Sequence, residues 1–212
     1  MADIRYSPER DDFSGAFQDP IQSPWVKADA ASWAANMWRN GSGSMIGKGG
    51  DSKYALTTVT MSGDMEVWGR PIISADITEG WRMALLKDVG SSGACDGYST
   101  RVAWNIGSET VTINRMTNGG FTGLANVDVT GLMGNAPPFF DFRLEGDQVE
   151  MWHGTDADNW FILASVTDST YRENLHPCLG ASSDDGTGPG WTAMGGGMKR
   201  RRIPQIYRRP NE

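Results

Sequence analysis

Three carboxylates and a tryptophan lie close together in the segment 139–153, and their types could support chemistry on a sugar. Glu145, Asp147 and Glu150 are spaced as E-x-D-x-x-E. Two carboxylates about 5 Å apart can act as nucleophile and acid in the retaining hydrolysis of a glycosidic bond. Trp152 follows closely, and an indole ring beside polar groups is a surface on which a pyranose ring can stack.

A predicted β-hairpin positions these groups. Apolar and polar residues alternate over 139–145 and again over 148–153, and Gly146-Asp147 between them supplies a two-residue turn. This turn places Phe142 opposite Met151, so that apolar residues meet on one face and polar residues meet on the other. A slip of one residue would destroy the agreement. We therefore expect a half-buried antiparallel sheet.

The hairpin separates the three carboxylates. Glu145 and Glu150 lie on different arms and Asp147 lies in the turn, whereas hydrolysis would need two carboxylates on one continuous strand face. We therefore interpret them as ordinary solvated side chains and predict no catalytic residue. Binding of a glycan without hydrolysis remains open, and its candidate residues are Arg143, Glu150 and Trp152 on the polar face of the hairpin.

The rest of the chain favours a single all-β domain. Its 212 residues include 27 glycines and nine tryptophans, and strand patterns follow one another without an intervening helical pattern. This order predicts an antiparallel two-sheet sandwich. The predicted strands are Asp64 to Ser74, Trp81 to Val89, Gly97 to Trp104, Glu109 to Met116, Phe121 to Val127, Phe139 to Glu145, Gln148 to His153 and Trp160 to Asp168. In the last of these we assign the alternating Trp160, Ile162, Ala164 and Val166 to the core.

Several other patterns leave alternatives open. The segment Asp29 to Met37 fits a helix, but Ser32 to Asn40 reads equally well as a strand. Cys95 and Cys178 could form a disulfide, although separate reduced thiols are the more common outcome for two such cysteines. With only two histidines, His153 and His176, a Ser-His-Asp triad or a multi-histidine metal site has almost nothing to draw on, and we interpret both as structural.

Charge divides the chain into an acidic body and a basic tail. The total of −7 combines −12 on residues 1–198 with +5 on the last fourteen residues. No apolar run reaches the roughly 20 residues of a membrane span, and the charged start of the chain is not a secretory signal. We expect an N-terminal arm at 1–10, a sandwich at 11–198 and a C-terminal tail at 199–212.

The tail reads KRRRIPQIYRRP, with apolar residues between its cations. We predict an extended arm that docks on another protein or another copy of the acidic body; a disordered end and a contact with nucleic acid are the alternatives. The docking residues would be Lys199, Arg200, Arg201, Arg202, Ile203, Ile206, Tyr207, Arg208 and Arg209.

Short motifs along the body resemble a known family of β-sandwiches. They are Asp11-Asp12-Phe13, the TINRMTNGGFTGL of 112–124, the FRLEGD of 142–147, the ASVTDSTY of 164–171 and the LGAS of 179–182. Together they look like the concanavalin-A-like, laminin-G-like jelly-roll domains, and more narrowly like those in structural proteins of tailed bacteriophages, especially actinobacterial phages. The resemblance covers roughly residues 11–197.

The resemblance implies a fold of two curved antiparallel sheets and a non-enzymatic virion structural protein. This would be a minor tail or tail-tip protein, made in the host cytoplasm without a signal peptide, with other virion proteins or further copies of itself as partners and a host surface glycan as a further ligand. The alternatives are a capsid decoration protein, a soluble carbohydrate-binding module and a laminarinase-type glycoside hydrolase. Membrane insertion and nucleic-acid binding are not expected.

The same family often holds calcium in acidic rim loops. We predict no obligatory cofactor, but two loops offer carboxylate oxygens that suit this ion. The candidate ligands are Asp156, Asp158, Asp184 and Asp185.

Overall fold

The computed structural model describes most of the predicted sandwich. The described residues are 9–14, 24–28, 36–39, 41, 43–48, 50–72, 80–89, 94–105, 108–132, 139–154, 160–183 and 190–198. The tail 199–212 and the acidic loops at 155–159 and 184–189 lie outside them. The predictions made for the tail and for calcium therefore stay predictions.

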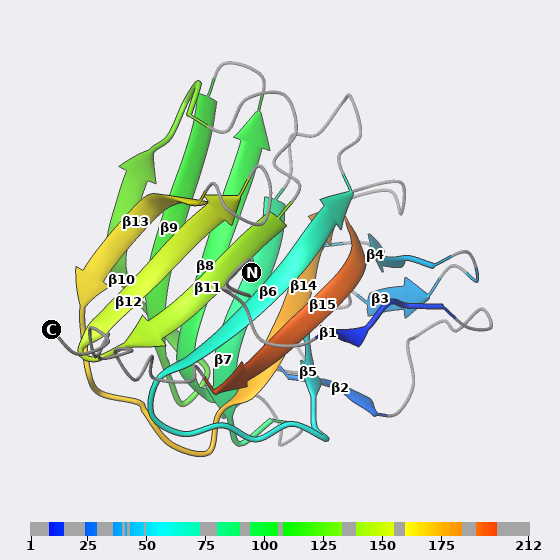
Figure 1. The fold of residues 1–212 in the computed structure, drawn as a ribbon, viewed down its shortest axis with the longest axis horizontal. Coiled ribbons are helices and arrows are strands. Elements are labelled where there is room, and N and C mark those ends of the chain that lie inside the picture. Colours follow the sequence, from blue (N-terminus) through cyan, green and yellow to red (C-terminus); the bar gives the residue numbers. More distant parts are fainter. Residues whose placement is uncertain are drawn as a thin grey trace, which may run out of the picture.

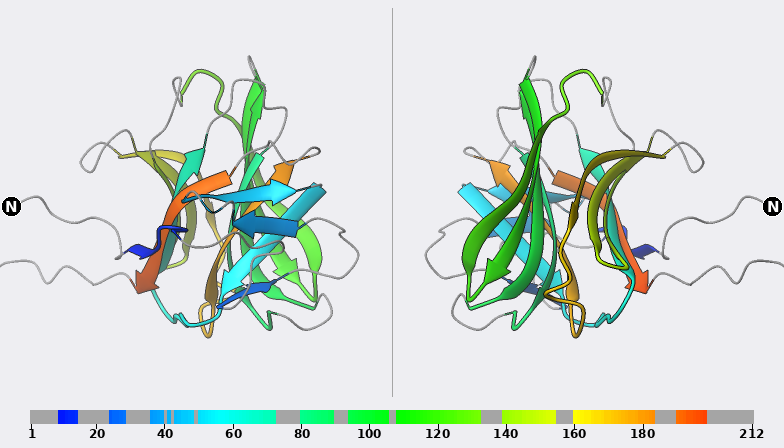
Figure 2. Two further views of the ribbon diagram at one scale, coloured as in Figure 1. Left: turned by 90° about the vertical axis from the view of Figure 1, so that its right-hand side faces the viewer. Right: turned by 90° about the vertical axis from the view of Figure 1, so that its left-hand side faces the viewer.

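Two antiparallel sheets pack face to face (Figures 1 and 2). Sheet A has the order β13-β12-β11-β6-β15-β4-β3, with β1 paired to β15, and sheet B has the order β10-β9-β8-β7-β14-β5-β2. The strands are β1 Glu9–Asp11, β2 Trp25–Lys27, β3 Asn36–Arg39, β4 Met45–Lys48, β5 Gly50–Leu56, β6 Met65–Ile72, β7 Gly80–Lys87, β8 Asp96–Asn105, β9 Ser108–Thr117, β10 Gly120–Asp128, β11 Phe139–Glu145, β12 Gln148–Gly154, β13 Trp160–Thr167, β14 His176–Ser183 and β15 Gly190–Met198. The all-β two-sheet prediction is confirmed.

All eight strands predicted from alternation are present, as β6 to β13. The last part of the ambiguous N-terminal segment, Asn36–Arg39, is a strand, whereas residues 29–35 lie outside the description. β1 begins at Glu9 and pairs with β15, two residues before the expected start of the sandwich. No helix of the described part of the chain is long and apolar enough to cross a membrane.

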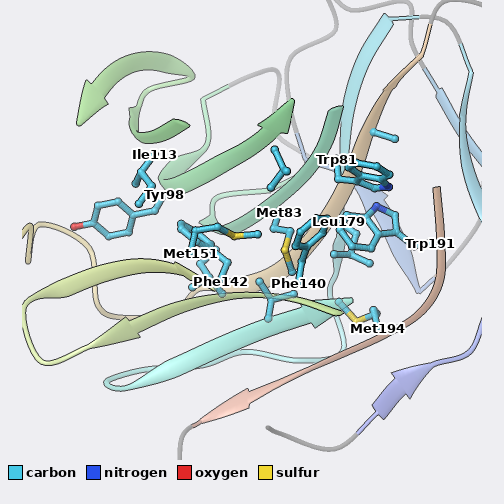
Figure 3. Close-up of a cluster of buried hydrophobic side chains, with 14 of the residues drawn as sticks. Trp81, Met83, Tyr98, Ile113, Phe140, Phe142, Met151, Leu179, Trp191 and Met194 are labelled. Atoms are coloured by element: carbon cyan, nitrogen blue, oxygen red, sulfur yellow. The ribbon is translucent and has the colours of Figure 1, made fainter. Parts of the chain in front are cut away.

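The core lies between the two sheets and is rich in aromatic rings and methionines (Figure 3). Trp81 on β7 and Trp191 on β15 are both fully buried. Each indole N–H donates across the layer, from Trp81 to the carbonyl of Gly190 at 3.2 Å and from Trp191 to the carbonyl of Gly180 at 2.8 Å. These two bonds run in opposite directions between the sheets, because Gly190 begins β15 and Gly180 lies in β14. They fix the relative position of the sheets.

The predicted hairpin has the predicted register. Phe142 lies opposite Met151, and Glu145 lies opposite Gln148. Gly146 has φ +57°, whereas Asp147 is not among the residues of positive φ, as the first and second central positions of a type II′ turn require. The alternation of polarity and the turn residues thus fix the pairing together.

One extra residue changes which side chains of β13 face the core. Between its pairs Ala164↔Met151 and Ile162↔Trp152, β13 contains a bulge at Leu163. A bulge shifts the alternation by one residue, so that Ala164 joins the core whereas Ile162 is 46% exposed. Our assignment of Trp160 and Ile162 to the core was therefore wrong, and both lie on the outer face of sheet A.

Glycines on β15 make room for a large side chain on that outer face. Gly195 pairs with Trp68 of β6, and a methyl group added at Gly195 would overlap the Trp68 indole. The ring is 2% exposed and rigid, so it cannot swing aside without disturbing its neighbours. Gly195 therefore determines where this indole lies.

Substitution Gly195→Ala should destabilise the protein by about 1–3 kcal/mol, because the buried indole of Trp68 must shift. Urea denaturation monitored by circular dichroism measures this change. Gly123→Ala on β10 is the control, because its nearest neighbouring atom would lie 3.9 Å from the added methyl. An equal effect of the two substitutions would contradict the role given to Gly195.

Candidate functional site

Three cross-strand rows of side chains cover the outer face of sheet A. Residues directly opposite each other in antiparallel strands project on the same face, so the registers of β13, β12, β11, β6 and β15 define the rows. The first row is Ser165, Glu150, Arg143, Glu66 and Gly197; the second is Ile162, Trp152, Asp141, Trp68 and Gly195; the third includes Trp160, Gly154 and Phe139. We call this surface the outer face.

A buried guanidinium lies at the centre of the outer face. The Nη2 and Nε of Arg143 both lie 2.5 Å from the Asp141 carboxylate, and its Nε lies 3.6 Å from that of Glu66. Burial by itself lowers the pKa of Arg143, but the carboxylates of Asp141, Glu66 and Glu150 raise it above its ordinary value. The guanidinium is therefore charged at all pH values at which the protein is folded.

Two indole rings enclose this guanidinium. Its Cζ lies 4.8 Å from the centre of the Trp152 ring and 5.4 Å from that of Trp160. The Trp152 indole N–H also donates to Glu150 Oε2 at 2.9 Å. Trp152 is thus held by its strand, by a cation on its ring and by a carboxylate at its nitrogen, which keeps the half-buried ring in one orientation.

An aromatic row continues from Trp160 toward the middle of the sheet. The Trp160 ring lies over Gly154, where an added Cβ would meet it at 3.0 Å. Its centre lies 6.1 Å from that of Phe139, which in turn lies 6.1 Å from Trp68. Phe139 and Trp68 are buried, whereas Trp160 is half-buried. The accessible edge of the outer face is therefore at β12 and β13.

The structure brings the three predicted glycan-binding residues together, but not as an exposed polar face. Arg143 is only 7% exposed, and Glu150 and Trp152 are half-buried. The expectation of a sheet buried on one side only is wrong for β11, whose residues from Phe139 to Leu144 are all buried. Ion pairing and the neighbouring rings allow this polar side of the strand to be covered.

Sequence reasoning missed five of the charged and aromatic members of the outer face. They are Glu66, Trp68, Phe139, Asp141 and Trp160. Phe139 and Asp141 alternate with the core residues of the same hairpin, so the signal for them was present. The bulge in β13 concealed that Trp160 lies on the outer face. Glu66 and Trp68 lie there because β6 pairs with β11, and alternation within a segment does not specify such a long-range pairing.

The E-x-D-x-x-E string crosses the turn, as the hairpin predicted. Glu145 ends β11, Asp147 is an exposed turn residue and Glu150 lies on β12. This is not the single-strand arrangement of a laminarinase-type site. Among the residues that the structure describes, no three His, Cys, Asp or Glu side chains are arranged to hold a metal ion.

The loop that follows β13 carries a second polar cluster. The Tyr98 hydroxyl donates to Asp168 Oδ1 at 2.5 Å, and Arg115 Nη1 lies 2.8 Å from Asp168 Oδ2. Burial and the bond to Asp168 raise the pKa of Tyr98 to about 12. Burial raises the pKa of Asp168, but hydrogen bonds from Tyr98 and Thr170 and the charge of Arg115 lower it below its ordinary value overall. These mutual bonds tie the loop to β8 and β9.

An open hollow of about 280 Å³ lies beside that loop. It is lined by Lys87, Ser169, Thr170, Tyr171, Arg172 and Glu173. Arg172 pairs with Asp64 at 2.8 Å, and Lys87 lies 3.8 Å from Asp96. Both cations of the hollow are already engaged, so the outer face of sheet A is the stronger candidate site.

Both cysteines and both histidines have structural surroundings. Cys95 and Cys178 are buried free thiols, so the disulfide alternative is not realised. His153 is buried and stacks on Phe161 with ring centres 5.3 Å apart, and burial lowers its pKa. His176 Nδ1 lies 2.7 Å from the Val59 carbonyl.

Substitution Arg143→Met should destabilise the protein by about 3–5 kcal/mol at neutral pH, because buried carboxylates lose their counter-charge. Part of the loss should be recovered at acidic pH, where those carboxylates take up protons. Arg143→Lys should be less damaging, since it keeps the charge but loses the contacts of the guanidinium with two indole rings. Thermal melts across the acidic range measure these differences. A Met variant as stable as the original protein at neutral pH would show that the cluster is not a coupled ion pair.

Comparison with known proteins supports the fold. No protein-family model and no curated protein sequence matches the chain. Among solved structures, the exoplasmic/lumenal domain of VIP36 in its calcium- and mannose-bound form has a TM-score of 0.56 at 11% identity, covering 90% of this chain and 86% of that one.

Two further structures give the same picture. The metal-free form of the VIP36 domain has a TM-score of 0.52 at 10% identity, covering 89% of this chain and 90% of that one. The potassium-bound carbohydrate recognition domain of Emp46p has a TM-score of 0.51 at 10% identity, covering 82% of this chain and 88% of that one. At such identities these likenesses show the fold alone, which is an antiparallel two-sheet jelly-roll sandwich.

Proposed function

We propose that this protein is a non-enzymatic carbohydrate-binding protein and that its glycan site is the accessible edge of the outer face. The observation that carries the proposal is the fixed pair of indoles, Trp152 and Trp160, which flank one buried guanidinium beside the carboxylate of Glu150. In this arrangement the rings supply a stacking surface and the carboxylate supplies an acceptor.

The chemistry of a sugar fits this pair of groups. The C–H face of a pyranose packs on an indole, and its hydroxyl groups donate to carboxylate oxygens. Only Oε2 of Glu150 is engaged by Trp152, which leaves its second oxygen for a ligand. Because Arg143 and Glu150 already hold Trp152, little rotamer entropy is lost on binding, and this preorganisation favours affinity.

The lectin-like fold adds support at the level of the protein class. The VIP36 domain was solved with calcium and mannose, and the Emp46p domain is a carbohydrate recognition domain. Calcium binding by this chain is a further proposal, with Asp156, Asp158, Asp184 and Asp185 as its candidate ligands. These residues lie outside the described part of the structure, and stacking of a sugar on Trp152 requires none of them.

The narrower proposal concerns where such a module works. The motif resemblance supports a virion structural protein of a tailed phage, at the tail tip or the capsid surface, that docks through residues 199–212 and presents the outer face to a host glycan. The body's excess of −12 against the tail's +5 is compatible with this docking.

Substitution Trp152→Ala should abolish glycan binding, and Trp160→Ala should weaken it, because stacking supplies much of the affinity. Affinity gel electrophoresis on laminarin, yeast mannan and soluble chitin fragments measures the retardation. Phe121→Ala on β10 is the control, since Phe121 is an aromatic residue 47% exposed on the other sheet. If none of the three polymers retards the original protein, the proposal of glycan binding is wrong.

The virion proposal predicts that antibody raised against the recombinant chain labels purified phage particles. Immunogold electron microscopy should show discrete label on the tail tip or on the head. A chain that remains free in the lysate, with unlabelled particles, would remove the virion role but leave glycan binding untouched.

A further inference from the structure

Two arginines lie directly opposite each other on the side of sheet B that points away from sheet A. β7, β8 and β9 are consecutive strands of this sheet (Figure 1). Arg82 of β7 lies opposite Arg101 of β8, which in turn lies opposite Thr112 of β9. The residues that alternate with them, such as Val102, belong to the core, so these three side chains point away from sheet A.

The positions that surround Arg101 on this side of the sheet hold no carboxylate. Most of their side chains are short, and the only further charge among them is that of Arg82. The surrounding positions are Gly80, Arg82, Ala84, Ser99, Ala103, Thr110, Thr112 and Asn114.

The guanidinium of Arg101 has no hydrogen-bond or ion-pair partner within the described structure. Its side chain lies over Gly80, where an added Cβ would be 3.0 Å from Nε, and this Nε is buried without an acceptor. A buried charged N–H group without an acceptor costs free energy, and like charges directly opposite each other destabilise a sheet. Arg82 has an interaction of its own, but as a cation it cannot neutralise Arg101.

This situation sets Arg101 apart from other arginines of the described chain. Arg115 and Arg172 each lie 2.8 Å from an aspartate oxygen, and Arg143 lies 2.5 Å from Asp141. The described residues therefore supply a counter-charge to those three cations and none to Arg101.

Hydroxyl groups on β9 add donors beside this guanidinium. Thr112 lies directly opposite Arg101, where Cβ atoms are about 5 Å apart, and Thr110 is its next neighbour on the same side. Both residues are half-buried. A carboxylate has two oxygens, which one guanidinium can occupy fully, whereas a phosphate or sulfate group has further oxygens that can accept from a hydroxyl.

We infer that Arg101 is the centre of a binding site for a tetrahedral oxyanion, a phosphate or sulfate group, on the side of sheet B that points away from sheet A. The guanidinium donates to two oxygens of the group, and the Thr112 hydroxyl donates to a third. The group is either a free ion or an ester carried by a larger ligand such as a sugar. The site lies on the other sheet from Trp152, and its binding of an anion does not depend on the proposed glycan site.

A nuclear magnetic resonance titration of the isotope-labelled full chain tests this site through the Nε–H resonances of its arginines. Sulfate, phosphate, glucose 6-sulfate and glucose 6-phosphate are added in turn at about pH 7, where these groups carry nearly two negative charges. Sodium chloride of equal ionic strength and plain glucose are the references. We expect a saturable shift of the Arg101 resonance with the oxyanions, no such shift with the references, and little change at the paired Arg115.

Variants test which groups hold the anion. Arg101→Gln should abolish the binding, and Thr112→Val should weaken it at least about threefold, because it keeps the shape of the side chain but loses a donor. Arg70→Gln makes the same change of net charge at an exposed position of sheet A and should bind normally. Because Arg101 has no described partner to lose, Arg101→Gln should fold.

The rise of the melting temperature with sulfate reports binding in the variants that lack the Arg101 resonance. A bound ion stabilises the folded state by mass action, whereas the general stabilising effect of sulfate is common to all variants. The rise should therefore be larger in the original protein and in Arg70→Gln than in Arg101→Gln.

The arms of the titration distinguish the sources of the anion. Shifts with the two esters support a site for a group attached to a sugar, and shifts with the inorganic ions alone support a site for a free ion. The inference is wrong if Arg101 shows no saturable shift up to about 50 mM sulfate, a concentration well above the millimolar range expected for a few charge-assisted hydrogen bonds. Equal shifts at Arg101 and Arg115, or an unchanged response in Arg101→Gln, would also contradict it, and all of these results would leave glycan binding by sheet A untouched.

Discussion

The outer face of sheet A depends on the contact between Arg143 and Asp141. A charge buried in a protein is tolerated only when it is paired, and Asp141, with no exposed surface of its own, meets that requirement. Once the guanidinium is fixed, it lies against two indole rings, those of Trp152 and Trp160. The two rings thereby become a fixed part of the sheet, although they come from β12 and β13 and their cation comes from β11.

Both sides of sheet A are therefore buried at its centre, by different means. The inner side packs conventional apolar side chains against sheet B, and the reciprocal bonds of Trp81 and Trp191 fix the two layers. The outer side uses ion pairs, aromatic rings and the space above Gly195 and Gly154. A strand such as β11 carries both kinds of burial on alternate residues, which ties the geometry of the site to the packing of the core.

The alternation of polarity sufficed to predict eight strands and the full register of the β11–β12 hairpin, because both depend on residues close in sequence. It could not show that β6 lies beside β11, and so it could not bring Glu66 and Trp68 to Arg143. A single bulge at Leu163 reversed the faces assigned to Trp160 and Ile162. The candidate residues Arg143, Glu150 and Trp152 were found because they lie in one hairpin, whereas Glu66, Trp68 and Trp160 come from other strands.

The two cysteines are free thiols, and this bears on the redox conditions under which the folded domain is stable. Cys95 and Cys178 are buried away from solvent and carry no cross-link. The described structure therefore contains no disulfide that would have to be oxidised for folding or protected from reduction afterwards. Buried thiols in apolar surroundings also react slowly with oxidants. The same folded domain can therefore pass from a reducing environment to an oxidising one without any change in its covalent structure.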